Sequence, residues 1–194
     1  MDLNVSENSS KFDNIISKIK KNLKIIVVFV SILLLIFLFF LYQRDAKDKQ
    51  AIKISNKFNV ARLLIEKGKI NDAKEIFYQI IDKKNKFYSP LSLYLIIENN
   101  MEENKDKILI SFDKIIKIKG LEKENKNLIK IKKALFLIEK NANEQKILNE
   151  LNPIINSNSI WKRESIEIIG DYLLSKGDKL KSEEFYKLLE NIEN

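Results

Sequence analysis

The strongest pattern in the chain is an unbroken apolar run from Ile25 to Tyr42. It contains no charge, no Gly and no Pro, and its only polar groups are the hydroxyls of Ser31 and Tyr42. At about 1.5 Å rise per residue, a helix of this length covers roughly 27 Å, which is close to the hydrocarbon thickness of a bilayer. A buried core helix is the alternative, but core helices of this length normally carry a polar face. The run therefore predicts a single transmembrane helix over 25–42.

The residues on either side of this run favour an uncleaved anchor. The residues that follow it, Gln43-Arg44-Asp45, lack the small-x-small pattern of a signal-peptide cleavage site. In the tail before it, 1–24, apolar residues recur at helical spacing between lysines, which predicts a short basic amphipathic helix on the anionic cytoplasmic leaflet. An ordinary helical extension of the span with a solvated face is an equal alternative. These apolar positions are Phe12, Ile15, Ile16, Ile19 and Leu23.

The charges around the run give a small bias in orientation. Lys18, Lys20, Lys21 and Lys24 precede the span closely, whereas Arg44, Lys47 and Lys49 follow it together with Asp45 and Asp48. Acidic residues count little in the positive-inside rule. We expect a cytoplasmic N-terminus, with the C-terminal part on the other side of the membrane.

From Ala46 onward, apolar residues recur at three- and four-residue spacing, interrupted by Gly, Asn and Pro. The pattern predicts an all-α chain without strands, in which residues 43–57 form a helical stalk and residues 58–194 form a helical-repeat domain. The absence of Gly and Pro before Gly68 favours helix from the span into the stalk. The predicted helices are 46–67, 70–84, 90–101, 105–119, 123–140, 143–151, 158–176 and 178–193.

A seven-residue spacing between a small residue and a turn residue recurs along this region. Ala61 and Gly68, Ala134 and Asn141, and Gly170 and Gly177 all show it. A small residue within a helix lets a second helix approach closely, and Gly at the helix end adopts positive φ. This is the logic of the tetratricopeptide repeat, in which a small residue and an aromatic residue follow in the second helix. The middle helix pairs are degenerate, with Leu95 or Ile96 and Phe112 as their counterparts.

The residues expected to pack the repeats share this logic, and none has a catalytic role. Trp161 is expected to begin a helix and to pack against a loop containing Pro153, rather than to bind a partner directly. The predicted repeat-packing residues are Ala61, Gly68, Ala73, Phe77, Ala134, Trp161, Gly170, Gly177, Ser182 and Tyr186.

The late part of the chain carries a further motif. It reads Leu151-Asn152-Pro153, then Trp161-Lys162-Arg163, then a helix ending in Gly177-Asp178. Together with the single span and the degenerate repeats, it resembles the YfgM-like family, the ancillary subunits of the bacterial Sec translocon with a tetratricopeptide-like domain. The resemblance covers most of the chain, although the middle repeats depart from the family pattern and the chain stops after the last repeat helix.

This resemblance implies a membrane-anchored scaffold with its C-terminal domain in the periplasm. Such a protein would link translocon subunits to periplasmic chaperones or unfolded clients, and its span would contact membrane lipid. A structural or division-associated protein of the cell envelope, built on the same repeats, is the alternative. The apolar residues of the last helix, Phe185, Leu188, Leu189 and Ile192, either pack on the preceding helix pair or form part of a docking surface.

Composition narrows the chemistry. The 194-residue chain contains no Cys and no His, so disulfides, thiolate or imidazole zinc sites and Cys–His or Ser–His–Asp systems are excluded. The net charge of +8 comes from lysines interleaved with acids, and only three Arg are present, which argues against nucleic acid. The neighbouring acids Glu102-Glu103 and Glu183-Glu184 point about 100° apart on a helix and form no catalytic dyad. We expect no enzyme activity, no cofactor, no metal and no small-molecule substrate.

Overall fold

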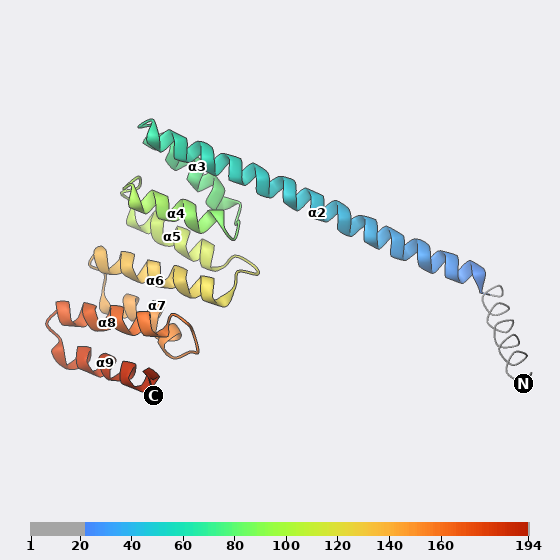
Figure 1. The fold of residues 1–194 in the computed structure, drawn as a ribbon. Coiled ribbons are helices and arrows are strands. Elements are labelled where there is room, and N and C mark those ends of the chain that lie inside the picture. Colours follow the sequence, from blue (N-terminus) through green and yellow to red (C-terminus); the bar gives the residue numbers. More distant parts are fainter. Residues whose placement is uncertain (1–21, 194) are drawn as a thin grey trace, which may run out of the picture. The chain divides into compact units, whose positions relative to one another are not determined.

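The computed structural model describes residues 22–193, and all regular elements of this range are α-helices (Figure 1). The side chains of residues 25, 26, 43, 45–48 and 191–193 lie outside the description, as does most of the amphipathic helix predicted within 1–24. The all-α prediction is confirmed for the described part of the chain. The helices are α2 (Leu23–Glu66), α3 (Ile70–Asp82), α4 (Tyr88–Glu98), α5 (Lys105–Ile116), α6 (Lys123–Glu139), α7 (Glu144–Ile155), α8 (Lys162–Ser175) and α9 (Lys179–Glu193).

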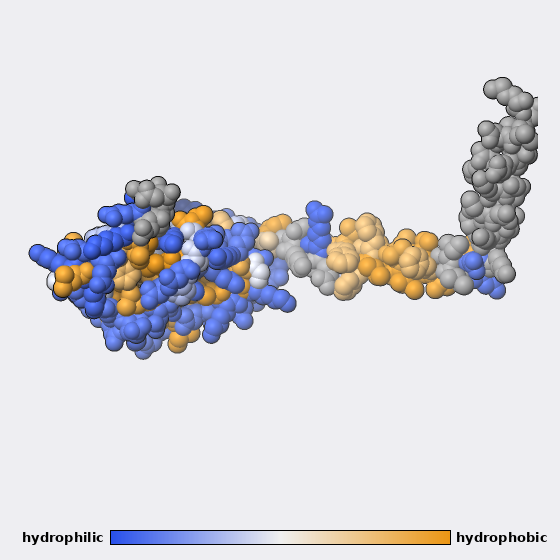
Figure 2. Space-filling view, turned by 90° about the horizontal axis from the view of Figure 1, so that it is seen from below, coloured by the Kyte–Doolittle hydropathy of each residue, from blue (hydrophilic) through white to orange (hydrophobic). Residues whose placement is uncertain are grey.

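The chain divides into two compact units, one ending at Lys53 and the other beginning at Ile54. In the first unit, the large apolar side chains from Val27 to Tyr42 are all exposed, between 46% and 74%. Figure 2 shows them as a continuous hydrophobic stretch of α2. The hydroxyl of Ser31 donates to the carbonyl of Val27 within the same helix, at 2.8 Å.

The predicted span falls partly outside what the structure describes. Within the described residues, no helix offers a segment with both the length and the apolar character that crossing a membrane requires. Ile25 and Ile26, which begin the predicted span, are among the residues whose side chains are not described. The span over 25–42 stays a prediction.

The second unit is a series of helical hairpins: α2 with α3, α4 with α5, α6 with α7, and α8 with α9. The first helix of each ends in the same way. A residue with positive φ follows it, namely Gly68 (72°), Asn100 (50°), Asn141 (52°) or Gly177 (84°). The next N–H then donates to a carbonyl five residues back, as in Lys69 to Leu64, Met101 to Ile96, Ala142 to Leu137 and Asp178 to Leu173. This Schellman motif satisfies carbonyls that the helix end leaves free.

These four helix ends establish a common register for the hairpins. Seven residues before each left-handed residue lies a buried residue: Ala61, Leu93, Ala134 or Gly170. In the second hairpin, Leu93 takes this position instead of the predicted Leu95 or Ile96. The bulky Leu93 replaces the small residue, which explains why this repeat is hard to detect from sequence.

The second helices of the hairpins follow the same register. Their fourth residues are all buried: Ala73, Ile108, Ile147 and Ser182. Four residues further on come Phe77, Phe112 and Leu151, each fully buried, and the half-buried Tyr186. Phe112 thus corresponds to Phe77. The second helix of each hairpin therefore carries one large side chain at the same register position.

Two apolar cores fill the unit, and α6 contributes to both. Ile129 and Phe136 of α6 belong to the core formed with α2–α5. Ile131, Ala134 and Leu137 belong to the core formed with α7 and α8. Opposite faces of α6 therefore join the first two hairpins to the last two.

The helix predicted over 143–151 is wrong at its C-terminal end. α7 continues to Ile155 and contains Pro153 in its last turn. A proline inside a helix removes one hydrogen bond and costs about 3 kcal/mol, but Ile154 and Ile155 beyond it are 0% and 4% exposed. Burying each isoleucine contributes about 1.5–3 kcal/mol, which offsets that cost.

The helix predicted from residue 158 begins instead at Lys162. The hydroxyl of Ser159 accepts hydrogen bonds from the amide of Asn127 and the backbone N–H of Trp161, at 3.0 and 3.1 Å, and donates to Glu124. These contacts hold residues 156–161 as a connection against the first turns of α6. Trp161 precedes α8 and packs on the second core. Because Pro153 lies within α7, the predicted Pro153 loop does not exist.

The remaining boundary differences are small. α5 ends at Ile116 rather than at 119, although Ile118 is still buried at 4% exposure. α4 begins at Tyr88, before Pro90, because proline is tolerated in the first turn of a helix. The side-chain oxygen of Asn85 accepts from the N–H groups of Phe87 and Tyr88 and satisfies this helix start.

Ser92 gives a test of the packing of α4. Its hydroxyl is fully buried and has no hydrogen-bond partner among the described residues. Because a buried unpaired hydroxyl is unfavourable and Ala favours helix, we expect Ser92→Ala to raise the free energy of unfolding by about 1 kcal/mol. Ser89 on the same helix is equally buried, but its hydroxyl donates to the carbonyl of Ile80 at 3.0 Å. Ser89→Ala should therefore lower stability by about 1 kcal/mol in the same urea titration. A stabilising effect of both variants would contradict this account.

Lys133 links three helices through one ammonium group. Its Nζ lies 2.7 Å from Asp113 of α5 and 2.5 Å from Glu150 of α7, and its side chain is 13% exposed. Burial alone would lower the pKa of Lys133, but hydrogen bonds to these two carboxylates raise it overall. The stabilisation by this ammonium is complete below the ordinary lysine pKa and is lost as pH rises through the higher folded-state value.

Removing this ammonium should leave Glu150 poorly solvated and unpaired. We expect Lys133→Met to lower the free energy of unfolding by about 1–2 kcal/mol. Lys114→Met is a matched control, since Lys114 pairs with Asp82 at 2.6 Å on the surface and surface pairs contribute about 0–1 kcal/mol. Equal effects of the two variants in urea unfolding would show that Lys133 contributes no more than a surface lysine.

Candidate functional site

A row of hollows follows α4 and α6, of which the first two are mainly apolar and the third is mainly polar. Three adjoining hollows of about 150, 360 and 270 Å³ share lining residues from these two helices. Tyr94 lines the first and second hollows, and Ile97, Glu98, Phe136 and Glu139 line the second and third. We call these adjoining hollows the α4–α6 groove.

The hairpin arrangement creates this groove. α4 and α6 are the first helices of successive hairpins, and α5 separates them in sequence and packs against both. The ring of Phe112 on α5 is fully buried and forms the base of the central hollow, with its centroid 6.1 Å from that of Phe136. The walls therefore come from helices that are not neighbours along the chain. Leu135 of α6 keeps 39% of its surface exposed in the central hollow.

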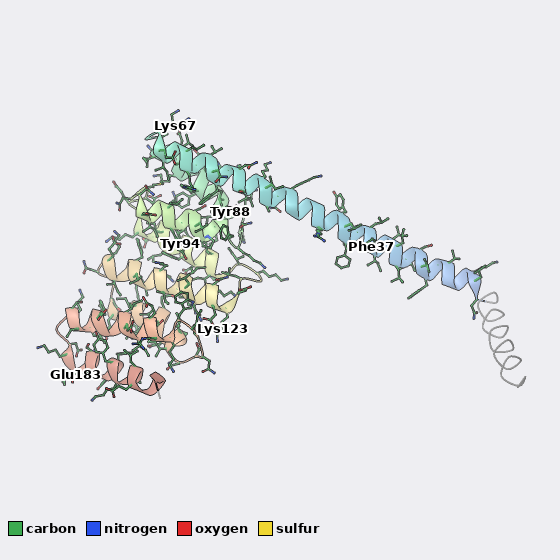
Figure 3. The ribbon with its side chains drawn as sticks, viewed as in Figure 1. Phe37, Lys67, Tyr88, Tyr94, Lys123 and Glu183 are labelled. Atoms are coloured by element: carbon green, nitrogen blue, oxygen red, sulfur yellow. The ribbon has the colours of Figure 1, made fainter. Side chains whose placement is uncertain are left out.

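Tyr94 of α4, labelled in Figure 3, lines both the first and the central hollow. It is half-buried, and no hydrogen bond to its hydroxyl is made by any described residue. By contrast, the hydroxyl of Tyr88 donates to Ser55 at 2.8 Å and that of Tyr78 donates to Glu102 at 3.2 Å. Burial raises the pKa of Tyr94 to about 12. A phenol that is partly buried and has no hydrogen-bond partner gains free energy when a ligand group hydrogen-bonds to it.

The raised pKa of Tyr94 gives an alkaline test. Because the ordinary value is 10.0, the unfolded chain ionises this phenol first, and folding stability should fall as pH rises from about 10 to about 12. We expect Tyr94→Phe to lose less stability than the parent chain over this interval. Urea unfolding of both proteins at matched pH values measures the difference. A parallel loss in the two proteins would show that the phenol is freely solvated.

The charges of the groove differ between its two ends. Lys86 lines the first hollow and Lys132 the central one. Glu98 and Glu139 line the central and third hollows, which lie at the C-terminal ends of α4 and α6. Glu98 has no ion-pair or hydrogen-bond partner among the described residues, whereas Glu139 pairs with the adjacent Lys140. The first hollow thus carries Lys86 alone, the central hollow carries Lys132 with the two glutamates, and acids outnumber the single Lys140 in the third.

The neighbouring acids Glu102 and Glu103 lie between α4 and α5 and behave differently. Glu102 lies 2.9 Å from Lys107, and this ammonium also lies 4.1 Å from the centre of the Tyr78 ring. The hydrogen bond with Lys107 lowers the pKa of Glu102, while Glu103 is exposed. The described residues hold no group of acidic side chains placed to bind a metal ion.

A second hollow, of about 550 Å³, lies on the other side of the hairpins between α3 and α5. Its lining alternates lysines with acids, including Lys74, Glu75, Asp82 and Lys114. Because Asp82 and Lys114 already pair with each other, this surface leaves fewer charged side chains unpaired than the α4–α6 groove does.

The predicted repeat-packing residues lie between helices and not in the groove. Ala61, Ala73, Phe77 and Ala134 are 0% exposed, and Gly68 and Gly177 end helices. Gly170, Ser182 and Tyr186 come together between α8 and α9, where the Ser182 hydroxyl donates to the Gly170 carbonyl at 2.9 Å. Trp161 packs on the second core, and its buried indole N–H lacks a partner among the described residues.

No protein-family model, curated protein or solved structure matches this chain. No family is therefore identified. The described helices pack in sequence, which is consistent with a helical-repeat domain.

Sequence reasoning missed the groove residues Tyr94, Glu98 and Leu135. One signal could have located them. Glu66, Glu98 and Glu139 each stand two residues before a left-handed residue, and Tyr94 and Leu135 each stand six before it. If the second repeat had been aligned with Asn100 as its left-handed residue, these residues would have fallen at equivalent positions in the first helices of successive hairpins.

Proposed function

We propose that this chain is a membrane-anchored scaffold that binds other proteins through its helical hairpins. The observation that carries this proposal is the α4–α6 groove. Its first two hollows are mainly apolar, and the central one exposes Leu135 and an unpaired phenol at Tyr94. Stacked helical repeats commonly bind extended segments of partner proteins along such surfaces. The common register of the four hairpins supports a tetratricopeptide-like domain.

The anchor is the second part of the proposal. The sequence from Ile25 to Tyr42 is apolar and uncharged, and its described apolar side chains lie exposed all along the helix. In water this surface would be unfavourable, whereas in a bilayer Leu, Ile, Phe and Val each contribute about 0.3–0.6 kcal/mol to insertion. The lysine bias before the run favours a cytoplasmic N-terminus and a periplasmic C-terminal unit in a bacterial inner membrane.

The resemblance to the YfgM-like family supports a more specific version of this function. In that version, the chain is an accessory subunit of the Sec translocon, and its hairpin unit contacts periplasmic folding factors or emerging clients. The residues that carry this resemblance, around Trp161 and Gly177, are packing residues. They support the fold more directly than they support a particular partner.

Two experiments in native membranes test this function. Protease added to spheroplasts should digest the hairpin unit and leave an anchored fragment protected, because the unit is expected outside the cytoplasm. Crosslinking of the full-length chain should then capture translocon or chaperone components. Protection of the hairpin unit would overturn the orientation. Crosslinks confined to proteins of the division site, together with septal localisation, would favour the envelope role over the translocon role.

A further inference from the structure

The α4–α6 groove has a chemical direction as well as an apolar base. Its central hollow combines Phe112, Phe136 and the partly exposed Leu135, and a volume of about 360 Å³ accommodates one large side chain. Burying such a side chain contributes about 1.5–3 kcal/mol. The base of the groove therefore supplies affinity for an apolar residue without selecting the residues around it.

The charged residues supply that selection. Glu98 and Glu139 occupy equivalent positions of α4 and α6, at the end of the groove where both helices terminate. The partial negative charge of two helix C-termini adds to these carboxylates. Glu66 takes the equivalent position in the first hairpin. A row of glutamates in one register is notable in a chain with a net charge of +8.

The opposite end excludes a second cation. Lys86 lines the first hollow, whereas Lys132 lines the central hollow together with Glu98 and Glu139. Neither lysine has an ion-pair partner among the described residues. Tyr94 stands between the two ends, and its free hydroxyl can bond the backbone of an extended segment. The groove is thus complementary to a segment with an apolar side chain and positive charge on one side of it only.

We propose that the α4–α6 groove binds an extended protein segment in which a bulky apolar side chain is flanked on one side by lysine or arginine. This inference rests on the proposed binding function and adds the chemistry and the direction of the partner. The apolar side chain enters the central hollow, and the cationic side chain lies beside Glu98. Rim charges of this kind set orientation and salt dependence more than total affinity.

Binding of short fluorescein-labelled peptides to the full-length chain tests this inference. The chain is placed in phosphatidylcholine nanodiscs, since this neutral lipid does not attract cationic peptides, and empty nanodiscs give the background. Three peptides share a central Phe and carry two Lys before it, two Lys after it, or two Glu in place of the Lys. We expect one of the two Lys peptides to bind about tenfold more tightly than the Glu peptide at low salt.

Paired variants separate the two contributions. Leu135→Ser should weaken every peptide about tenfold, which corresponds to about 1.4 kcal/mol, whereas Ile110→Ser, at an exposed position of α5 outside the groove, should leave binding unchanged. Neutralising Glu98→Gln and Glu139→Gln together should remove the preference for the Lys peptide and most of its salt dependence. Glu183→Gln with Glu184→Gln on α9 changes net charge equally and should have no effect.

The possible results distinguish this inference from the function on which it rests. Equal affinity for the Lys and Glu peptides, or no loss with Leu135→Ser, would overturn the inference. A photo-crosslinking residue in place of Lys132 in native membranes supplies the independent measurement. Partner crosslinks without any peptide charge preference would leave the scaffold function standing and remove the proposed chemistry. An absence of protein crosslinks from both this position and the rest of the hairpin unit would overturn the function itself.

Discussion

Phe112→Ala is expected to lower the free energy of unfolding of the hairpin unit by about 3–5 kcal/mol. Phe112 is 0% exposed and belongs to the core formed by α2–α6. Its ring contacts Phe136, on the helix that joins the two cores. Truncation to Ala leaves a cavity at the base of the groove and removes an aromatic contact. Urea unfolding of the full-length chain in micelles measures the loss.

Phe87→Ala provides a control of the same chemistry. Phe87 is 64% exposed and pairs only edge-on with Tyr88, at 5.0 Å between ring centroids. An aromatic pair contributes about 0.5–1.5 kcal/mol, so this variant should lose no more than that. Comparable losses in the two variants would contradict the assignment of Phe112 to the core.

The fluorescence of Trp161 reports the unfolding of the second core. This residue is the only tryptophan in the chain, and it packs on the second core, whereas Phe112 lies in the first. Because α6 contributes to both cores, we expect Trp161 fluorescence and circular dichroism to report one shared transition. A shift in circular dichroism without a shift in Trp161 fluorescence would show that the two cores unfold separately, as weakly coupled repeats do.

The sequence predicted most of the hairpin architecture because the hairpins are local structures. Three of four hairpins combine a small residue with Gly or Asn seven positions later, and each of these positions has a simple steric reason. The second hairpin lacks the small residue, since Leu93 fills the helix contact, although Asn100 does supply the left-handed residue seven positions later. The end of α7 was mispredicted because burial of Ile154 outweighs the local effect of Pro153.

The groove could not be predicted in the same way. Its walls come from α4 and α6, which are not consecutive helices, and its width depends on how α5 holds them apart. Tyr94 and Leu135 have the spacing of ordinary core residues in the sequence. Only the tertiary arrangement leaves the phenol of Tyr94 unpaired and Leu135 partly exposed. Glu98 and Glu139 likewise resemble any other solvated acids until the hairpins are aligned.

Gly170→Val should also destabilise the hairpin unit, by about 1–3 kcal/mol. A Cβ built on Gly170 would lie 2.6 Å from Cε1 and 2.9 Å from Cζ of Tyr186. Two further contacts fix this approach, because the Ser182 hydroxyl donates to the Gly170 carbonyl and the Tyr186 hydroxyl donates to Asp171 at 2.6 Å. Valine would gain only a few tenths of a kcal/mol in helix propensity over glycine, so overpacking decides the sign.

A double-mutant cycle assigns this loss to the ring of Tyr186. In a Tyr186→Ala background the ring beside residue 170 is absent. The cost of Gly170→Val in free energy of unfolding should then fall below about 0.5 kcal/mol, which is the deviation usual between sites that do not interact. In a Tyr186→Phe background the ring remains while its hydrogen bond to Asp171 is lost, and the full cost of Gly170→Val should persist. Trp161 fluorescence follows unfolding in all variants, since Trp161 and Phe185 contact the same core. If Tyr186→Phe relieved the cost as well as Tyr186→Ala, the hydrogen bond rather than the ring would restrict residue 170, and the small residue of this repeat would need a different explanation from close helix approach.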